Sequence, residues 1–170
     1  MENTDLIKQF IDGDEKSFDL LIKNNQSWVI NLIQSIVHNE YDSEDIAQDV
    51  FVNIYFSLRK FRFESSFKTW AYRIIINRIN NYFRKEKVRS LFNNDIENKD
   101  SKVFQEQHDE NMQLYHMTYK LPKIQRNVVI LRVFQDLQFK VISEILNISV
   151  NSAKVSFHKA KENLKGMIHG

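Results

Sequence analysis

The chain has 170 residues, of which 42% are hydrophobic, enough for one domain or two small ones with packed cores. It contains no cysteine, three widely spaced glycines and one proline, which excludes disulfides, thiolate metal ligands and glycine-rich phosphate loops. The scarcity of helix breakers predicts long helices, and no segment has a convincing strand pattern. The N-terminus lacks the apolar core of a signal peptide, and no apolar run is long enough to span a bilayer, so a cytoplasmic protein without membrane insertion is expected.

The net charge of +2 is distributed in blocks of alternating sign. Residues 1–58 carry 3 basic and 11 acidic residues, whereas residues 59–89 carry 10 basic and 2 acidic ones. Residues 90–117 are acidic again, with 2 basic and 6 acidic residues, and residues 118–170 are basic, with 9 and 3. The blocks predict two basic surfaces for a polyanion and acidic segments that face a different partner.

Helical periodicity predicts a short first helix over residues 6–12, capped by Asn3 or Thr4 and ended by Gly13. A second helix is expected from Asp14 to about Val37. A polar break follows before the next helix.

Asp42 is the expected N-cap of a third helix that reaches about residue 61, with Glu44 in its first turn. One face of this helix is apolar and is predicted to be buried; it consists of Ile46, Val50, Ile54 and Leu58. Other faces carry Asp45, Gln48, Asp49 and Val52.

Residues 61–66 form a predicted loop, and Ser66 is expected to cap a fourth helix that ends near Lys87. In residues 61–87, basic side chains alternate with aromatic ones. Cations neutralise phosphates and aromatic rings stack on unpaired bases, so the segment favours binding to opened nucleic-acid strands. Composition alone also fits an amphipathic helix with core aromatics and a solvated basic face.

Residues 88 to about 105 lose periodicity, and a flexible charged linker is predicted there. A helix is expected to resume near Gln105, with Tyr115 among its packing residues, and Pro122 is expected to be the first residue of the next helix. A break at residues 135–137 separates that helix from the last two.

The C-terminal segment has the pattern of a helix-turn-helix. A short helix covers residues 139–146, Asn147 allows a left-handed turn, and Ser149 caps a basic last helix. The start of the last helix is small and polar, as entry into a major groove requires. An ordinary helix pair with solvated lysines is the alternative.

Three segments together resemble the extracytoplasmic-function sigma factors of bacterial RNA polymerase. The segment DSEDIAQDVF (42–51) is similar to the family's core-polymerase-binding helix, and SFKTWAYR (66–73) with Asn77 resembles its −10 segment. LPKIQRNVVILR (121–132) and residues 139–161 resemble its −35-reading domain. The sequence departs from the usual family residues at Asn81, Asn151, Ser156 and Lys161.

The resemblance implies an all-α protein of two small helical domains joined by a flexible linker, the second domain being the helix-turn-helix. The expected ranges are 1–88 for the region 2-like domain, 89–105 for the linker and 106–170 for the region 4-like domain. The implied partners are core RNA polymerase, promoter DNA (single-stranded at −10 and duplex at −35) and an anti-sigma factor. No enzymatic activity, cofactor or metal is expected.

The resemblance also implies three sets of contact residues. Contacts with core polymerase are expected from Asp45, Gln48, Asp49 and Val52. Contacts with the −10 element are expected from Arg62, Phe63, Phe67, Lys68, Trp70, Arg73, Asn77, Asn80, Asn81 and Arg84. Contacts with the −35 element are expected from Asn151, Ser152, Lys154, Val155, Ser156, His158, Lys159 and Lys161.

Two other function classes are weaker alternatives. A helix-turn-helix regulator that acts without polymerase would account for residues 121–165, but it would leave the acidic helix and the basic aromatic segment unexplained. An enzyme could use Asp45 and Asp49 as a carboxylate pair, although this spacing is more typical of a solvated face. His108 and His116 are eight residues apart and form no recognised zinc motif.

Overall fold

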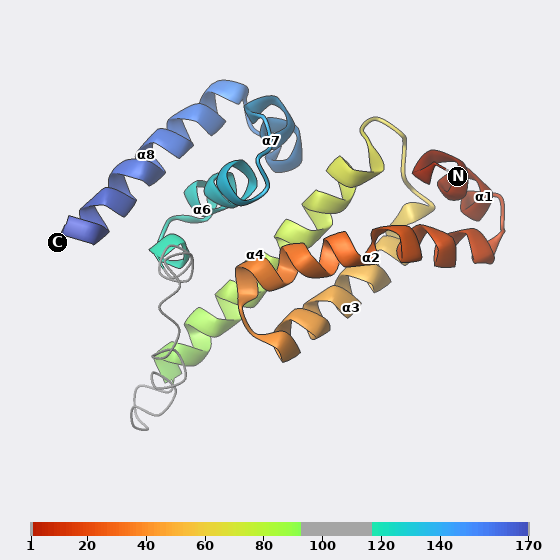
Figure 1. Ribbon diagram of the computed structural model, residues 1–170, viewed down its shortest axis with the longest axis horizontal. Helices are drawn as coiled ribbons and strands as arrows, with labels where there is room; N and C mark the ends of the chain where they lie inside the picture. Colours follow the sequence, from red (N-terminus) through yellow and green to blue (C-terminus); the bar gives the residue numbers. More distant parts are fainter. Residues whose placement is uncertain (1, 93–116, 170) are drawn as a thin grey trace. The chain divides into compact units, whose positions relative to one another are not determined.

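The computed structural model describes residues 2–92 and 117–169. Within these ranges the protein is entirely helical and contains no strand, which confirms the predicted all-α class. The chain divides into two compact units at residues 79 and 80, within helix α4 (Figure 1).

The first two helices are α1 (Asn3–Ile11) and α2 (Glu15–Val37), which pack against each other. Gly13 joins them in a left-handed conformation with φ 107°, as predicted, and the Asp14 side chain caps α2 by accepting from the Lys16 N–H at 3.1 Å. The predicted cap of α1 is wrong, because Asn3 is already helical; its side chain exchanges hydrogen bonds with Asn25 of α2 instead.

Helix α3 (Glu40–Leu58) lies beside α2 (Figure 1). Its N-cap is Asn39 rather than the predicted Asp42, because the Asn39 side chain accepts from the Asp42 N–H at 3.0 Å and the helix therefore begins earlier. The helix also ends three residues before the predicted end at residue 61. The predicted apolar face is buried and consists of Ile46, Val50, Ile54 and Leu58.

Helix α4 (Phe67–Phe92) begins at the predicted cap, where the Ser66 hydroxyl accepts from the Thr69 N–H at 3.1 Å. It continues five residues beyond the predicted end at Lys87 because no breaker interrupts it. Within the first unit it contacts α2, where the Tyr72 and Trp28 rings meet edge to face with centroids 4.9 Å apart. Its core residues are Ala71, Ile75, Ile76 and Ile79.

The second unit contains the C-terminal turns of α4 and the helices α6 (Lys123–Val129), η3 (Ile130–Phe134), α7 (Phe139–Leu146) and α8 (Val150–His169). Pro122 precedes α6 as its N-cap instead of being its first residue, since its ψ of 145° is not helical. Helix α6 continues directly into η3, a π-helical turn that the sequence did not predict. The predicted break then follows at Gln135.

The helix-turn-helix has the predicted form. Helix α7 ends at Asn147, which is left-handed at φ 53°, and the Ser149 hydroxyl caps α8 by accepting from the Ser152 N–H at 3.0 Å. Helix α8 packs on both α6 and α7 (Figure 1). Its buried face consists of Ala153, Ala160 and Leu164, with Phe157 half-buried beside them.

Residues 89–92 were predicted to belong to the linker but are part of helix α4. The rest of the predicted linker, residues 93–105, and the helix expected near Gln105 with Tyr115 lie outside the described residues. No helix of the described ranges has the length and apolar character needed to cross a membrane.

The two internal glycines give a matched test of backbone energetics. A side chain at Gly13 or Gly166 would meet no atom within 4 Å, so only backbone preferences differ between the sites. Gly13→Ala should lower the free energy of unfolding by about 1 kcal/mol, since alanine is strained at positive φ. Gly166→Ala, in the last turns of α8, should raise it by roughly 0.5 kcal/mol. Urea unfolding followed by far-ultraviolet circular dichroism measures both; equal effects would contradict this interpretation.

Candidate nucleic-acid interface

The outward face of α3 is acidic at its start and apolar towards its end. Asp45, Gln48 and Asp49 are exposed, and Val52 follows one turn later with 54% of its surface exposed. These four predicted residues therefore share one face of the helix, opposite the buried one. The arrangement suits a protein partner that offers both cations and apolar side chains.

Two further exposed residues of this face were not predicted from the sequence. Phe56 lies one turn beyond Val52 and is 71% exposed, and Tyr41 in the first turn is also exposed. A large exposed aromatic side chain that continues an apolar stripe marks a binding surface more often than a lone exposed residue does. The four-residue step from Val52 to Phe56 was the signal that could have revealed it.

One ion pair joins this face to α4. The Arg78 guanidinium lies 3.7 Å from the Asp49 carboxylate, whose side chain remains mostly exposed. Exposed pairs of this kind contribute about 0.2–1 kcal/mol. Asp49 therefore remains accessible to a partner. Its replacement should lower the free energy of unfolding only slightly.

The basic aromatic segment has buried and exposed aromatic residues in one cluster. Phe61 and Phe67 are buried, and the half-buried Trp70 packs between them, with ring centroids 5.1 and 5.9 Å away. Phe67, predicted to touch DNA, is 6% exposed, so its main contact is this cluster. Trp70 is therefore partly packed and partly accessible.

Phe63 sits at the tip of the loop that precedes α4, in the left-handed region at φ 57°. This conformation is strained for a bulky residue, and the ring is nevertheless 41% exposed. It leans on the Phe61 ring, with centroids 4.9 Å apart. The loop thus presents a flat, accessible ring beside exposed Arg62.

The basic side chains of α4 face outward. Lys68, Arg73 and Arg84 are exposed, and the Lys68 ammonium lies 5.0 Å over the Trp28 ring. The predicted asparagines differ: Asn77 is exposed and Asn81 half-buried. Asn80 is 9% exposed, and its Oδ1 accepts from Arg126 at 3.1 Å within the second unit. The three asparagines are therefore not equally accessible.

The start of α8 presents the predicted groove-facing set. Asn151, Ser152, Lys154 and Val155 are exposed, and Ser156 is half-buried. Ser152 also accepts from the Ser149 hydroxyl at 2.8 Å, so the cap orients its side chain. Small polar groups and one lysine at the exposed start of a helix can reach base edges in a major groove.

Further along α8, the exposed side chains are positioned by their neighbours. The His158 Nε2 lies 3.3 Å from a Glu162 carboxylate oxygen, and the Lys161 ammonium lies 5.2 Å over the Phe157 ring. Lys159 is exposed. These side chains lie beyond the first two turns of α8, where a helix docked in a groove can reach the phosphate backbone.

The described part of the chain contains no group of three or more histidine, cysteine, aspartate or glutamate residues that could hold a metal ion. The candidate site consists of three surfaces. They are an acidic and apolar face on α3, a basic aromatic face on α4 with its preceding loop, and the exposed start of α8.

Comparison with known proteins identifies two family segments. The family model for Sigma-70 region 2 matches residues 21–89, and the model for Sigma-70, region 4 matches residues 111–164. The first match includes the faces of α3 and α4, and the second includes the helix-turn-helix.

Curated relatives match along nearly the whole chain. The RNA polymerase sigma-H factor of Pseudomonas aeruginosa is 28% identical, with 95% of this chain and 91% of the relative covered. The ECF RNA polymerase sigma-E factor of Haemophilus influenzae is 29% identical, with 96% and 93% covered. The ECF RNA polymerase sigma factor SigW of Bacillus subtilis is 27% identical, with 94% and 92% covered.

Solved structures share the fold. CnrH, in its complex with the cytosolic domain of CnrY, superposes with a TM-score of 0.69 at 20% identity and covers 96% of this chain, which covers 95% of CnrH. The sigma factor RpoE of Bartonella quintana, in complex with the anti-sigma factor NepR, gives 0.65 at 16%, with 91% and 98% covered. With both sigma regions in order and relatives along its length, the chain belongs to the extracytoplasmic-function group of RNA polymerase sigma factors.

Proposed function

We propose that this sigma factor directs core RNA polymerase to its promoters and helps to open the −10 element. The observation that carries the proposal is the pairing of two unlike exposed faces on adjacent helices of the first unit. A partly apolar acidic face on α3 suits a protein partner, and a basic aromatic face on α4 suits opened DNA. A duplex binder that acts alone needs neither combination.

The α3 face is the proposed polymerase contact. Asp45, Gln48 and Asp49 would supply polar contacts, and Val52 with Phe56 the apolar area that anchors such interfaces. Since these side chains are already exposed, docking needs no rearrangement of the helix.

The −10 contacts are proposed for the loop before α4 and for the outer face of α4. Unstacking a base costs a few kcal/mol, which a captured base recovers by stacking and by hydrogen bonds to its edges. Phe63 and the accessible part of Trp70 would offer aromatic surfaces for stacking. Asn77 and Asn81 can both donate and accept, and the cations hold the phosphates. Phe67 would act by supporting Trp70, and Asn80 would need to separate from Arg126 before it contacts DNA.

The −35 contacts are proposed for α8. Its first two turns would read base edges through Asn151, Ser152, Lys154, Val155 and Ser156. His158, Lys159 and Lys161 would lie along the phosphates.

The proposed domains are 1–88 and 106–170, with a linker between them. The family matches, which end at residue 89 and begin at residue 111, support this division. We further propose that the chain has no enzymatic activity, acts in the cytoplasm where polymerase works, and is held by an anti-sigma factor. The last point is supported by the similar fold of the sigma factor RpoE of Bartonella quintana, whose structure contains the anti-sigma factor NepR.

Promoter-specific transcription with purified core polymerase tests the proposed function and its polymerase contact. The wild-type chain should start transcripts at a defined promoter, and Gln48→Ala/Asp49→Ala should weaken core binding by at least about tenfold. Its unfolding midpoint should stay nearly unchanged, since the one ion pair lost is exposed. DNA binding without any core-dependent initiation would favour the stand-alone regulator, and unaltered core affinity in a pull-down titration would remove the two residues from the interface.

Variants of Phe63 and Trp70 distinguish a role in DNA contact from a role in core packing. Phe63→Gly should leave the free energy of unfolding unchanged or raise it by about 1 kcal/mol, because glycine relieves the positive φ. Promoter opening, followed by permanganate reactivity of thymines, should nevertheless fall. Trp70→Ala should lower both opening and the unfolding midpoint, since its ring packs on Phe61. Normal opening by both folded variants would exclude a stacking role.

Helix α8 should contain lysines of two kinds, one that contacts bases and one that contacts phosphates. Lys154→Ala should reduce the preference for cognate over scrambled −35 duplex by about 1–3 kcal/mol, as loss of a base contact does. Lys159→Ala should weaken both duplexes alike and flatten the salt dependence. Lys165→Ala, the same charge change further along α8, is the control in the anisotropy titrations. An equal loss on both duplexes for Lys154→Ala would show that it contacts phosphate only.

A further inference from the structure

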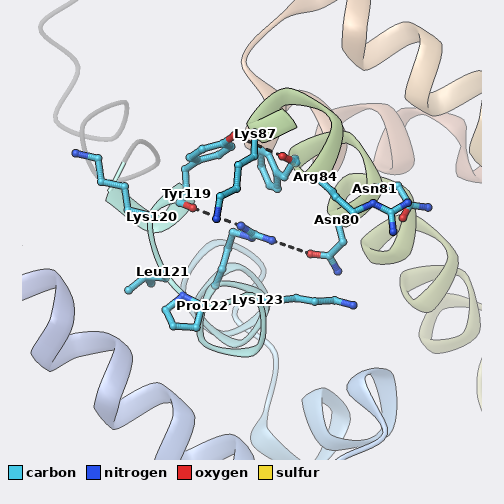
Figure 2. A pocket seen from close by; sticks show the side chains of 11 residues that line it. Asn80, Asn81, Arg84, Lys87, Tyr119, Lys120, Leu121, Pro122 and Lys123 are labelled. Atoms are coloured by element: carbon cyan, nitrogen blue, oxygen red, sulfur yellow. Dashed lines mark hydrogen bonds between the residues drawn. The ribbon is translucent and has the colours of Figure 1, made fainter. Parts of the chain in front are cut away.

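The second unit contains a pocket of about 710 Å³, within the size range of small-molecule sites (Figure 2). Every residue that lines it belongs to this unit: the C-terminal turns of α4, the segment before α6, and α6 itself. Five lining residues are basic and none is acidic; the basic ones are Arg84, Lys87, Lys120, Lys123 and Arg126. A concentration of one charge at a concave site attracts ligands of the opposite charge.

Arg126 forms one wall of the pocket, and within residues 2–92 and 117–169 it contacts neutral groups. Its guanidinium lies 4.7 Å over the Phe83 ring and donates to Asn80 Oδ1 at 3.1 Å and to the Tyr119 carbonyl at 3.4 Å. Its Nε and the Nδ2 of Asn80 are buried donors without a hydrogen-bond partner. Burial lowers the pKa of Arg126, because loss of water disfavours the charged form. A bound anion would give the Arg126 guanidinium a partner of opposite charge.

Two of the other basic side chains border the cavity. Figure 2 shows the Lys87 side chain pointing into the pocket and Lys123 extending along its edge, whereas Lys120 points away. Tyr119 is partly exposed beside them, and its hydroxyl donates to the Phe83 carbonyl at 3.4 Å. The pocket therefore combines several cationic donors with an aromatic face.

We propose that this pocket binds an oligophosphate, either inorganic or the phosphate chain of a nucleotide. Arginine and lysine are the usual donors to phosphate oxygens, and charge-assisted hydrogen bonds are the stronger class. Several phosphates in one chain match several cations around one cavity better than a single anion does. Tyr119 offers a face on which the base of a nucleotide can stack. Three of the lining residues, Asn80, Asn81 and Arg84, are also proposed −10 contacts, so an oligophosphate bound here would compete with the −10 strand for them.

Isothermal titration calorimetry on the full-length chain tests the proposal, with sodium tripolyphosphate and adenosine triphosphate as the two ligands. Each should bind saturably at one site per chain. Lys87→Ala/Lys123→Ala, two residues outside the proposed promoter and polymerase contacts, should weaken binding by at least about tenfold. Lys140→Ala/Lys165→Ala removes the same charge from exposed positions of the same unit that do not line the pocket. It should change affinity by less than about twofold.

The outcomes distinguish the sources of phosphate. Tighter binding of adenosine triphosphate, lost on Tyr119→Ala, supports a nucleotide, whereas equal affinities support an inorganic chain. The proposal is overturned by absence of saturable heat, by equal losses in the two double variants, or by unchanged affinity in Lys87→Ala/Lys123→Ala. A short single-stranded oligonucleotide that binds more tightly than both ligands, with the same dependence on Lys87 and Lys123, would show a strand-binding groove instead. Transcription assays remain interpretable in each case, because neither lysine belongs to the proposed promoter contacts.

Discussion

The first unit depends on helix α4 having one face buried in the core and another exposed to solvent. With 3.6 residues per turn, the helix buries Ile75, Ile76 and Ile79 while it exposes Arg73 and Asn77. Full burial of each isoleucine contributes about 1.5–3 kcal/mol, far more than any exposed ion pair. Packing of the apolar stripe therefore fixes the rotation of the helix, and with it the direction of the residues proposed to meet DNA.

The same constraint links the two proposed partners. Helix α3 buries its own apolar stripe, so Asp49 and Val52 must face outward. The Arg78–Asp49 pair marks where the outer surfaces of α3 and α4 meet, with the acidic one on the first helix and the basic one on the second. A protein partner and a DNA strand can thus occupy neighbouring surfaces without competing for side chains.

In the loop before α4, packing of aromatic rings supports a residue with strained backbone. Phe63 holds an unfavourable positive φ, while Phe61 beneath it is buried and touches both Phe63 and Trp70. Strained residues persist only where their surroundings determine the conformation, and they concentrate at functional loops. The aromatic cluster supplies that support, which explains why a segment rich in phenylalanine also has exposed rings.

The helical class and many helix boundaries could be predicted from the sequence alone, because they follow from local rules. The Asp14 and Ser66 caps, the left-handed Asn147 and the buried stripe of α3 each depend on residues within one or two turns. Competition between nearby caps was harder to resolve, as the choice of Asn39 over Asp42 shows. Only tertiary structure decided which residues of a mixed face are accessible. It buried Phe67, exposed Phe56, and paired Asn80 with Arg126, which is 46 residues away in the chain. Helical periodicity gives a residue's direction from its own axis, but accessibility is set by the neighbouring helices packed against that axis.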